Sequence, residues 1–514
     1  MTVTMGAILR NRANLSPEMD AVVTPKNRYN YRTFNQRVNQ LAHFLLAQNV
    51  KKGDRVAVLC GTDHYFPTVF FATAKIGAMV VPLNYRLNAS ELEWIIRDCT
   101  PKALFYDGEF SPLVSGLEGL SFLNLMIQTS FDGEIHPQYG EVFREYPVTE
   151  PEVDVWGEDS CLLLYTSGTT GKPKGVISTH QNLFASAMAT VHPLSVQEKD
   201  RLLVPTPLFH VSGIFAITTA SLMGYTLILM PQFHPVHIWD LAEQEGATQM
   251  AAVPMMMKLM LAALWEEERD VGTLRTIITG GSDVPVELIQ QYDALGFSIT
   301  NVYGASEFTG IAAYWNSGMG LDKMDSVGKS LLADIRIVNP DTGEPVPTGE
   351  VGEIICRGMQ VFQGYWNNEQ ETKKVLRDGW YYTGDAGKFD EEGYLYVVDR
   401  YKDVILVDAG ENVYPAEVER VIRQLEGISE VAVVGVKDKL WGELPWAYVV
   451  LEEGSTLTEN VILSHVHQEL APYKLSQVRF IEKLPKNGFG KVQKFKLREH
   501  ANEEKKKEEE QSQV

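Results

Sequence analysis

The chain has 514 residues, which at about 100–200 residues per domain predicts about two to four domains. Hydrophobic residues make up 45% and charged residues 22%, which is typical of a globular protein and excludes a disordered or collagen-like chain. Acidic residues outnumber basic ones by 67 to 46. The net charge of −21 disfavours a nucleic-acid partner, because nucleic-acid binding depends on basic surfaces.

The four cysteines lie far apart in the sequence and form no CxxC pair. This spacing fits neither a disulfide framework nor a zinc site, and we expect a reducing compartment. The N-terminal segment lacks the apolar core of a signal peptide, so we expect a cytoplasmic protein. Residues 211–230 carry no charge and match a membrane span in length, but Ser, Thr and Gly dilute the run. We interpret it as a buried helix, a turn and a buried strand, so that membrane contact is at most peripheral.

Short apolar runs alternate with helical segments in the first half of the chain. Strand-like runs occupy residues 54–60, 79–83, 103–107 and 122–128. Such alternation predicts α/β architecture with parallel sheets. From residue 334 onward, β-like runs joined by Asp-, Gly- and Pro-rich turns predict an antiparallel β subdomain.

The pattern changes again after residue 401. An amphipathic helix is predicted over 416–427 and buried strands over 431–436 and 446–452, which is enough for a small α+β domain. We therefore predict an α/β protein whose large N-terminal domain, 1–401, holds two α/β subdomains and a β subdomain. The C-terminal domain covers 402–514, and its mixed-charge tail from residue 501 is expected to fray.

The most informative run is residues 165–175, with the sequence YTSGTTGKPKG, directly after the apolar strand CLLLY. Small hydroxylated residues and glycines let backbone N–H groups surround an anion, and the two lysines add positive charge. From these residues alone, a flexible surface loop remains the alternative. A Walker A loop is excluded because Lys172 is followed by Pro173 instead of Ser or Thr.

This run resembles the phosphate-loop signature of adenylate-forming enzymes, which include acyl-CoA synthetases, luciferases and peptide-synthetase adenylation domains. Six further segments follow in the family's order: PLFHVSG, TGGSDVP, NVYGASE, GEIICRG with GYWN, DGWYYTGD with YLYVVDRYKD, and GENVYPAEVE with PKNGFGK. The resemblance covers nearly the whole chain and is strongest to bacterial fatty-acyl-CoA synthetases. It implies ATP, Mg²⁺ and coenzyme A as cofactors, a small-molecule carboxylic acid as substrate and a mobile C-terminal domain, and it leaves a homodimer open.

The resemblance also assigns the nucleotide contacts. These are Thr166, Ser167, Gly168, Thr169, Thr170 and Lys174 for the phosphates, Gly281, Ser282 and Tyr303 for adenine, and Asp385 with Arg400 for the ribose. Ser306, where the family usually has Thr, is assigned to the α-phosphate, and Glu307 to Mg²⁺. A carboxylate suits that ion, which prefers hard oxygens and few protein ligands. Without the surrounding pattern, Glu307 would be interpreted as an exposed loop residue.

Three further residues match catalytic features of the family. Lys491, in a Gly-Lys context, is assigned to bridge the substrate carboxylate and the α-phosphate, where its ammonium offsets developing charge. Lys402 matches the hinge about which the C-terminal domain swings between two poses. His210 matches an aromatic gate between the acyl pocket and the thiol tunnel. General-base duty is not assigned to it, because a thiol pKa of about 8.5 already leaves some thiolate.

Departures from the family pattern concern coenzyme A. Gly410 and Trp441 are the expected contacts for this ligand, but Ala409 stands where the family commonly has glycine. The extra methyl group would narrow the passage for the pantetheine arm. The thioester half-reaction is therefore less firmly predicted than the adenylation.

The acid is predicted from the candidate pocket wall, which is apolar or small: Phe209, Val211, Gly213, Met255, Gly304 and Ala305. Residues 208–231 hold no acidic side chain, which disfavours a free amino acid as substrate. The Met-rich segment 250–265 suits variable apolar shapes, although such a stripe is more often core. We predict an ATP-dependent ligase that joins a medium- or long-chain fatty acid to coenzyme A. Three alternatives stay open: an aryl or arylpropenoic acid as the substrate, a different acceptor, and a luciferase-like oxygenase. The presence of Lys491 and Glu307 argues against a nucleotide-binding regulator without catalytic activity.

Overall fold

The computed structural model describes residues 3–117, 120–123, 125–131, 134–166, 173–191, 196–264, 270–281, 284–407, 411–438, 442–486 and 492–511. The chain forms two compact units. The first comprises Met1–Ile335 and Cys356–Tyr382, and the second Arg336–Ile355 and Thr383–Val514. The domain boundary that we predicted at 401/402 differs from this division and stays a prediction.

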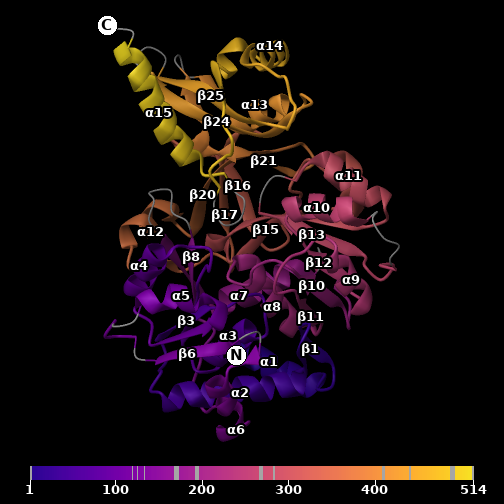
Figure 1. Cartoon of the computed structure of the whole chain (residues 1–514), viewed down its shortest axis with the longest axis vertical. Helices are drawn as coiled ribbons and strands as arrows, with labels where there is room; N and C mark the ends of the chain where they lie inside the picture. Colours follow the sequence, from indigo (N-terminus) through magenta and orange to yellow (C-terminus); the bar gives the residue numbers. More distant parts are fainter. Residues whose placement is uncertain are drawn as a thin grey trace. The chain divides into compact units, whose positions relative to one another are not determined.

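Two mixed sheets organise the first unit (Figure 1). Sheet A has the order β15-β14-β13-β12-β10-β11-β1-β2. Its strands are β1 (Asp20–Val23), β2 (Arg28–Asn30), β10 (Arg201–Val204), β11 (Thr226–Leu229), β12 (Gln249–Ala251), β13 (Thr276–Gly280), β14 (Ser298–Ala305) and β15 (Gly310–Asn316). The inner neighbours run parallel, and the edge pairs β14–β15 and β1–β2 are antiparallel.

Sheet B has the order β18-β9-β8-β4-β3-β5-β6-β7. It consists of β3 (Arg55–Leu59), β4 (Met79–Pro82), β5 (Ala103–Asp107), β6 (Leu125–Phe131), β7 (Glu134–Ile135), β8 (Ser160–Thr166), β9 (Lys174–Thr179) and β18 (Gly364–Tyr365). In β3, Val56 and Val58 join one hydrophobic cluster while Ala57 and Leu59 join another, on the opposite face. Burial on both faces explains why these strands are continuous apolar runs.

Helices cover these sheets. They are α1 (Met5–Leu15), α2 (Tyr31–Ala47), α3 (Tyr65–Lys75), α4 (Ala89–Cys99), α5 (Ser111–Val114), α6 (Pro137–Glu145), α7 (His180–Val191), α8 (Val211–Met223), α9 (His237–Gln244), α10 (Pro254–Leu264), α11 (Val286–Ala294) and α12 (Glu369–Val375). The predicted strands recur within a residue or two at β3, β4 and β5, whereas β6 begins at Leu125 instead of residue 122. The predicted α/β class is confirmed.

The uncharged run at residues 211–230 forms α8 and β11, as predicted. Gly224 ends the helix in the left-handed conformation, with φ of 75°, and the chain turns there into the strand. All four residues of β11 are buried. Among the described residues, no helix combines the length and the apolar character that crossing a membrane requires.

A smaller sheet has the order β16-β17-β20-β19, with β21 paired to β20. Its strands are β16 (Asp334–Val338), β17 (Gly352–Arg357), β19 (Leu376–Arg377), β20 (Trp380–Phe389) and β21 (Leu395–Arg400). The pairs β19–β20 and β20–β21 are antiparallel, which agrees with the β subdomain predicted from residue 334.

The second unit contains a further sheet of the order β23-β22-β25-β24, with β26 paired to β25. Its elements are β22 (Ile405–Val407), β23 (Glu411–Val413), α13 (Pro415–Ile422), β24 (Ile428–Asp438), β25 (Gly442–Leu451), α14 (Glu459–Glu469), β26 (Gln477–Phe480) and α15 (Lys494–Gln511). Alternate residues of β24 face opposite sides, as the period of a strand requires. Val431 and Val433 pack with α13 and α14, whereas Ala432, Val434 and Val436 pack with α15.

The tail that we expected to fray is helical to Gln511, and that expectation was wrong. Figure 1 shows α15 alongside β24 and β25. Leu497 and Ala501, one turn apart, are buried in a cluster with residues of these two strands. Lys505 also forms an ion pair with Asp438. Two apolar residues in a highly charged segment are a weak sequence signal, but they suffice when one face of a sheet must be covered.

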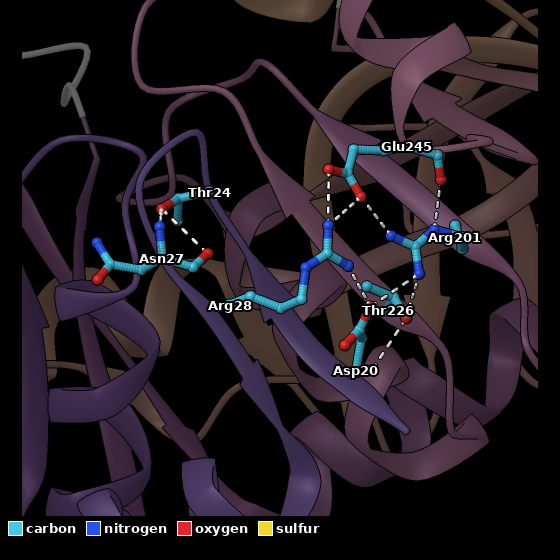
Figure 2. A network of polar contacts seen from close by, with 7 residues as sticks. All are labelled: Asp20, Thr24, Asn27, Arg28, Arg201, Thr226 and Glu245. Carbon is cyan, nitrogen blue, oxygen red and sulfur yellow. Dashed lines mark hydrogen bonds and ion pairs between the residues drawn. The ribbon is translucent and has the colours of Figure 1, made fainter. Parts of the chain in front are cut away.

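A polar network fixes the β1–β2 hairpin at the edge of sheet A (Figure 2). The carboxylate of Glu245, only 10% exposed, lies between Arg28 and Arg201, each at 2.7 Å. Asp20 contacts the same two guanidinium groups at 2.5 and 3.2 Å. Thus two cations and two carboxylates, from the β1–β2 hairpin, β10 and the end of α9, neutralise one another. Such partly shielded networks contribute more than isolated surface pairs.

Buried His180 links α7 to α1, because its Nδ1 accepts the backbone N–H of Met5 at 3.2 Å. Burial lowers the pKa of His180 from 6.5 to about 4, which keeps the imidazole neutral. Between these two values the unfolded chain binds more protons than the folded one. Stability is therefore lost as the pH falls from 6.5 through 4.

We expect the free energy of unfolding of the wild type to fall across this pH window by roughly 3 kcal/mol more than that of His180→Gln. Urea denaturation at pH values from about 7 to 4 measures the difference. His237→Gln, which changes an exposed histidine, should retain the wild-type pH dependence. Parallel curves for His180→Gln and the wild type would contradict this assignment.

Candidate functional site

The carboxyl ends of four neighbouring strands define the candidate site in the first unit. Strands β10, β12, β13 and β14 run parallel, so the segments that follow them share one edge of sheet A. PTPLFH follows β10, Gly281 follows β13, and Tyr303, Gly304 and Ala305 end β14. Ligands of open α/β sheets bind at this edge. The fold thus brings together predicted adenine and acyl residues that are far apart in sequence.

The phosphate-loop signature connects β8 to β9. These strands are antiparallel, and Thr166 lies opposite Lys174, so the intervening residues bridge adjacent strand ends. Ser167, Gly168, Thr169 and Thr170 lie outside the described residues. The Lys174 ammonium contacts Glu371 Oε2 at 2.6 Å and lies 5.2 Å from the ring centroid of Tyr365. The hydrogen bond from Lys174 lowers the pKa of Glu371.

The NVYGASE segment forms the end of β14 and the short helix η3 (Ser306–Phe308). Packing requires the glycine of this segment, Gly304. A Cβ at Gly304 would lie 1.8 Å from the carbonyl oxygen of Gly310, and a register irregularity separates Tyr303 from Gly304. Gly310 itself has φ of 135°. This close approach fixes the backbone at the end of β14, directly before Ser306 and Glu307.

The Glu307 carboxylate is half-buried, and its Oε1 accepts a hydrogen bond of 2.9 Å from Tyr365 Oη. Its backbone carbonyl accepts the N–H of Phe362, also at 2.9 Å. No group of three or more His, Cys, Asp or Glu that could hold a metal ion occurs in the part of the chain that the structure describes. A single partly exposed carboxylate nevertheless suits Mg²⁺, which commonly takes one or two protein ligands and completes its shell with water and phosphate.

Phe209, one of the residues predicted to line the acyl pocket, packs with other aromatic side chains. The Phe209 ring lies 4.5 Å from His210 and 4.9 Å from Tyr85, and Tyr85 stacks on Phe110 at 4.9 Å with an interplanar angle of 9°. Tyr85 and Phe110 were not predicted, although they follow β4 and β5, at the carboxyl edge of sheet B. Burial, and next the charge of Arg86, lower the pKa of His210 well below 6.5, so its imidazole is neutral.

The other predicted acyl residues differ in their surroundings. Val211 begins α8 and is half-buried. Gly213 is buried, and a Cβ there would lie 2.4 Å from Leu208 Cα, so this glycine lets α8 approach the preceding segment. Met255 is 55% exposed at the start of α10, whereas Met257 and Met260 are fully buried. The Met-rich helix therefore contributes both core residues and an outward-facing side chain.

The predicted ribose pair lies on adjacent strands of the second unit. Asp385 of β20 is opposite Arg400 of β21, and Arg400 Nε contacts Asp385 Oδ1 at 2.7 Å. Asp385 is only 6% exposed. Its backbone N–H donates to Thr383 Oγ1, and the intervening Gly384 has φ of 69°. The structure brings this predicted pair together.

The remaining predicted residues fall largely outside the described ranges. This applies to Lys491, Ser282, Gly410 and Trp441, while the backbone of Lys402 lies in the short helix η6 (Tyr401–Asp403). On either side of Lys402 in the sequence, Asp399 Oδ2 accepts the N–H of Ala416 at 2.8 Å and Arg498 pairs with Asp403 at 2.8 Å. Burial raises the pKa of Asp399. The segment around the predicted hinge is thus tied to α13 and α15.

Comparison with known proteins gives two family matches. The model of the AMP-binding enzyme family matches residues 9–366, and that of the AMP-binding enzyme C-terminal domain matches residues 417–491. The putative acyl-CoA ligase YdaB of Bacillus subtilis is 37% identical over 96% of this chain and 98% of its own. The long-chain-fatty-acid–CoA ligase FadD13 of Mycobacterium tuberculosis is 36% identical, with coverages of 96% and 98%. A feruloyl-CoA synthase of Amycolatopsis is also 36% identical, covering 95% and 97%.

Solved structures agree with these relatives. ATP-bound MatB from Rhodopseudomonas palustris has a TM-score of 0.89 at 28% identity, covering 98% of this chain and 99% of that one. The fatty acyl CoA synthetase of Mycobacterium tuberculosis has a TM-score of 0.80 at 35% identity, with coverages of 97% and 98%.

Gly304→Ala is expected to destabilise the protein by about 3 kcal/mol or more, because the new methyl group meets the rigid backbone of Gly310. Thermal unfolding measures this loss. Gly116→Ala, at an exposed glycine with open space around its Cβ position, serves as the control and should be tolerated. Equal stability of the two variants would contradict the close approach.

Proposed function

This chain belongs to the AMP-binding enzyme family, and from that premise we propose that it is an AMP-forming acyl-CoA ligase. The substrate carboxylate attacks the α-phosphate of ATP, forming acyl-AMP and releasing pyrophosphate. The sulfur of coenzyme A then attacks the acyl carbonyl, forming the thioester and releasing AMP. The observation that carries this proposal is the gathering of the family's motif residues at the carboxyl edge of sheet A.

Several residues of this chain suit the handling of ATP. Lys174 and the backbone of the loop beginning at Thr166 would bind phosphates, and Ser306 would contact the α-phosphate. Glu307 would hold Mg²⁺, which neutralises charge on the phosphates when bound. Asp385, which only accepts hydrogen bonds when ionised, would bind the ribose hydroxyls, and Arg400 holds it in place. Gly281 and Tyr303 would line the adenine site.

The C-terminal residues complete the proposal. Lys491 would place its ammonium between the substrate carboxylate and the α-phosphate, where it offsets the charge of the transition state. Rotation about Lys402 would then withdraw Lys491 and bring Gly410 and Trp441 to coenzyme A. His210, which is neutral and whose ring lies 4.5 Å from that of Phe209, would act as a gate and not as a base.

For the acid, we propose a medium- or long-chain fatty acid. The absence of acidic side chains from residues 208–231 and the outward-facing Met255 suit a flexible apolar chain. The likeness to FadD13 supports this class. The stacked pair of Tyr85 and Phe110 favours a second candidate, an aryl or arylpropenoic acid, because flat rings suit planar substrates. The likeness to a feruloyl-CoA synthase supports that candidate.

The test is a panel of straight-chain and aromatic acids with ATP, Mg²⁺ and coenzyme A, in which AMP, pyrophosphate and thioester are each measured. We expect all three products, with a fatty acid giving the highest kcat/KM. A preference for an aromatic acid would replace the first candidate by the second. Pyrophosphate without thioester would indicate a different acceptor and implicate Ala409. Absence of all products would contradict the ligase.

Lys491→Ala is expected to reduce acyl-AMP formation by a factor of roughly 10² to 10³, because one charge-stabilising donor is lost from the transition state. Thioester formation from preformed acyl-AMP should remain within about twofold of wild type, since that step does not use this ammonium. Lys496→Ala, at a nearby exposed lysine, is the matched control. Equal loss of both half-reactions would contradict the role given to Lys491.

A further inference from the structure

Glu307 is held from one side by the segment that includes β18. Tyr365 Oη donates to Glu307 Oε1 at 2.9 Å, and the backbone N–H of Phe362 donates to the Glu307 carbonyl at the same distance. Both the main chain and the side chain of Glu307 therefore contact one short stretch. Tyr365 is 8% exposed, so bulk water competes little for its hydroxyl group.

Tyr365 is itself rigidly placed. As part of β18 it pairs with Val176 of β9, the strand that leaves the phosphate loop. Its N–H donates to Thr372 Oγ1 at 2.8 Å, and its ring packs against Phe362 at 5.0 Å. A hydroxyl group on such a rigid side chain can orient the carboxylate that accepts its hydrogen bond.

The chemistry of the contact suits a cation ligand. Within the described residues, Glu307 Oε1 is engaged by the hydroxyl group, whereas Oε2 has no hydrogen-bond partner. A neutral donor orients a carboxylate without cancelling its negative charge. A lysine or arginine partner would cancel that charge. Lys174, whose ammonium lies 5.2 Å from the centroid of the Tyr365 ring, is paired instead with Glu371. Glu307 thus presents one oxygen in a fixed direction.

We propose that Tyr365 is a positioning residue that orients the Glu307 carboxylate toward the divalent cation that accompanies ATP. This inference rests on the proposed function. It assigns to the GYWN stretch a part in metal binding, through a side chain that touches neither the nucleotide nor the acid. Groups that orient metal ligands commonly change metal affinity by about 10- to 100-fold when removed.

The test is ATP binding measured by calorimetry, in EDTA and at increasing concentrations of Mg²⁺, for the wild type and Tyr365→Phe. The variant keeps the ring beside Lys174 and removes only the hydroxyl group. We expect unchanged ATP affinity in EDTA and about a 10-fold rise in the Mg²⁺ concentration that half-saturates the enhanced binding. Tyr146→Phe is the control, since the half-buried Tyr146 packs on Phe44 through its ring.

A second variant separates orientation from structure. Glu307→Asp keeps a carboxylate but withdraws it from Tyr365 by one methylene, so it should shift the Mg²⁺ dependence in the same direction. Its effect and that of Tyr365→Phe should be less than additive. A lower unfolding temperature of Tyr365→Phe with unchanged Mg²⁺ dependence would overturn the proposal. Wild-type protein that binds no ATP at any Mg²⁺ concentration would overturn the proposed function as well.

Discussion

Strands β10, β12, β13 and β14 are neighbours in sheet A and run in the same direction, and the rest of the candidate site depends on this arrangement. Each strand ends at the same edge, so the segment after each strand contributes its side chains to one place. The buried faces of these strands carry no chemistry. They supply rigidity, while Phe209, Gly281 and Tyr303 lie where the apolar runs stop.

Charge pairing is a second feature, and it occurs in each unit by itself. Lys174 pairs with Glu371 in the first unit, and Asp385 with Arg400 in the second. Each pair holds a charged side chain in a defined position without a ligand. A shielded charge without a partner would cost free energy, so such pairing allows the site to form before substrate arrives.

Much of this could be predicted from the sequence, because both the strands and the motifs are local signals. The apolar runs at β3, β4 and β5 and the helix–turn–strand at residues 211–230 were found from composition alone. Tyr85 and Tyr365 were missed because their roles arise from neighbours in space, Phe209 and Glu307 respectively. The α15 tail was missed for the same reason: Leu497 and Ala501 matter only against the face of β24.

The same distinction explains why the reaction is easier to infer than the acid. The proposed ATP contacts use backbone geometry and charge, and both leave marks in sequence, such as Gly304 of NVYGASE and the carboxylate of Asp385. An apolar acid is selected by the shape between side chains. Here Phe209 and His210 follow a strand of sheet A, whereas Tyr85 and Phe110 follow strands of sheet B. The shape of the predicted acyl-pocket wall depends on how the two sheets pack. A small change in packing therefore alters the preferred acid while every motif stays intact.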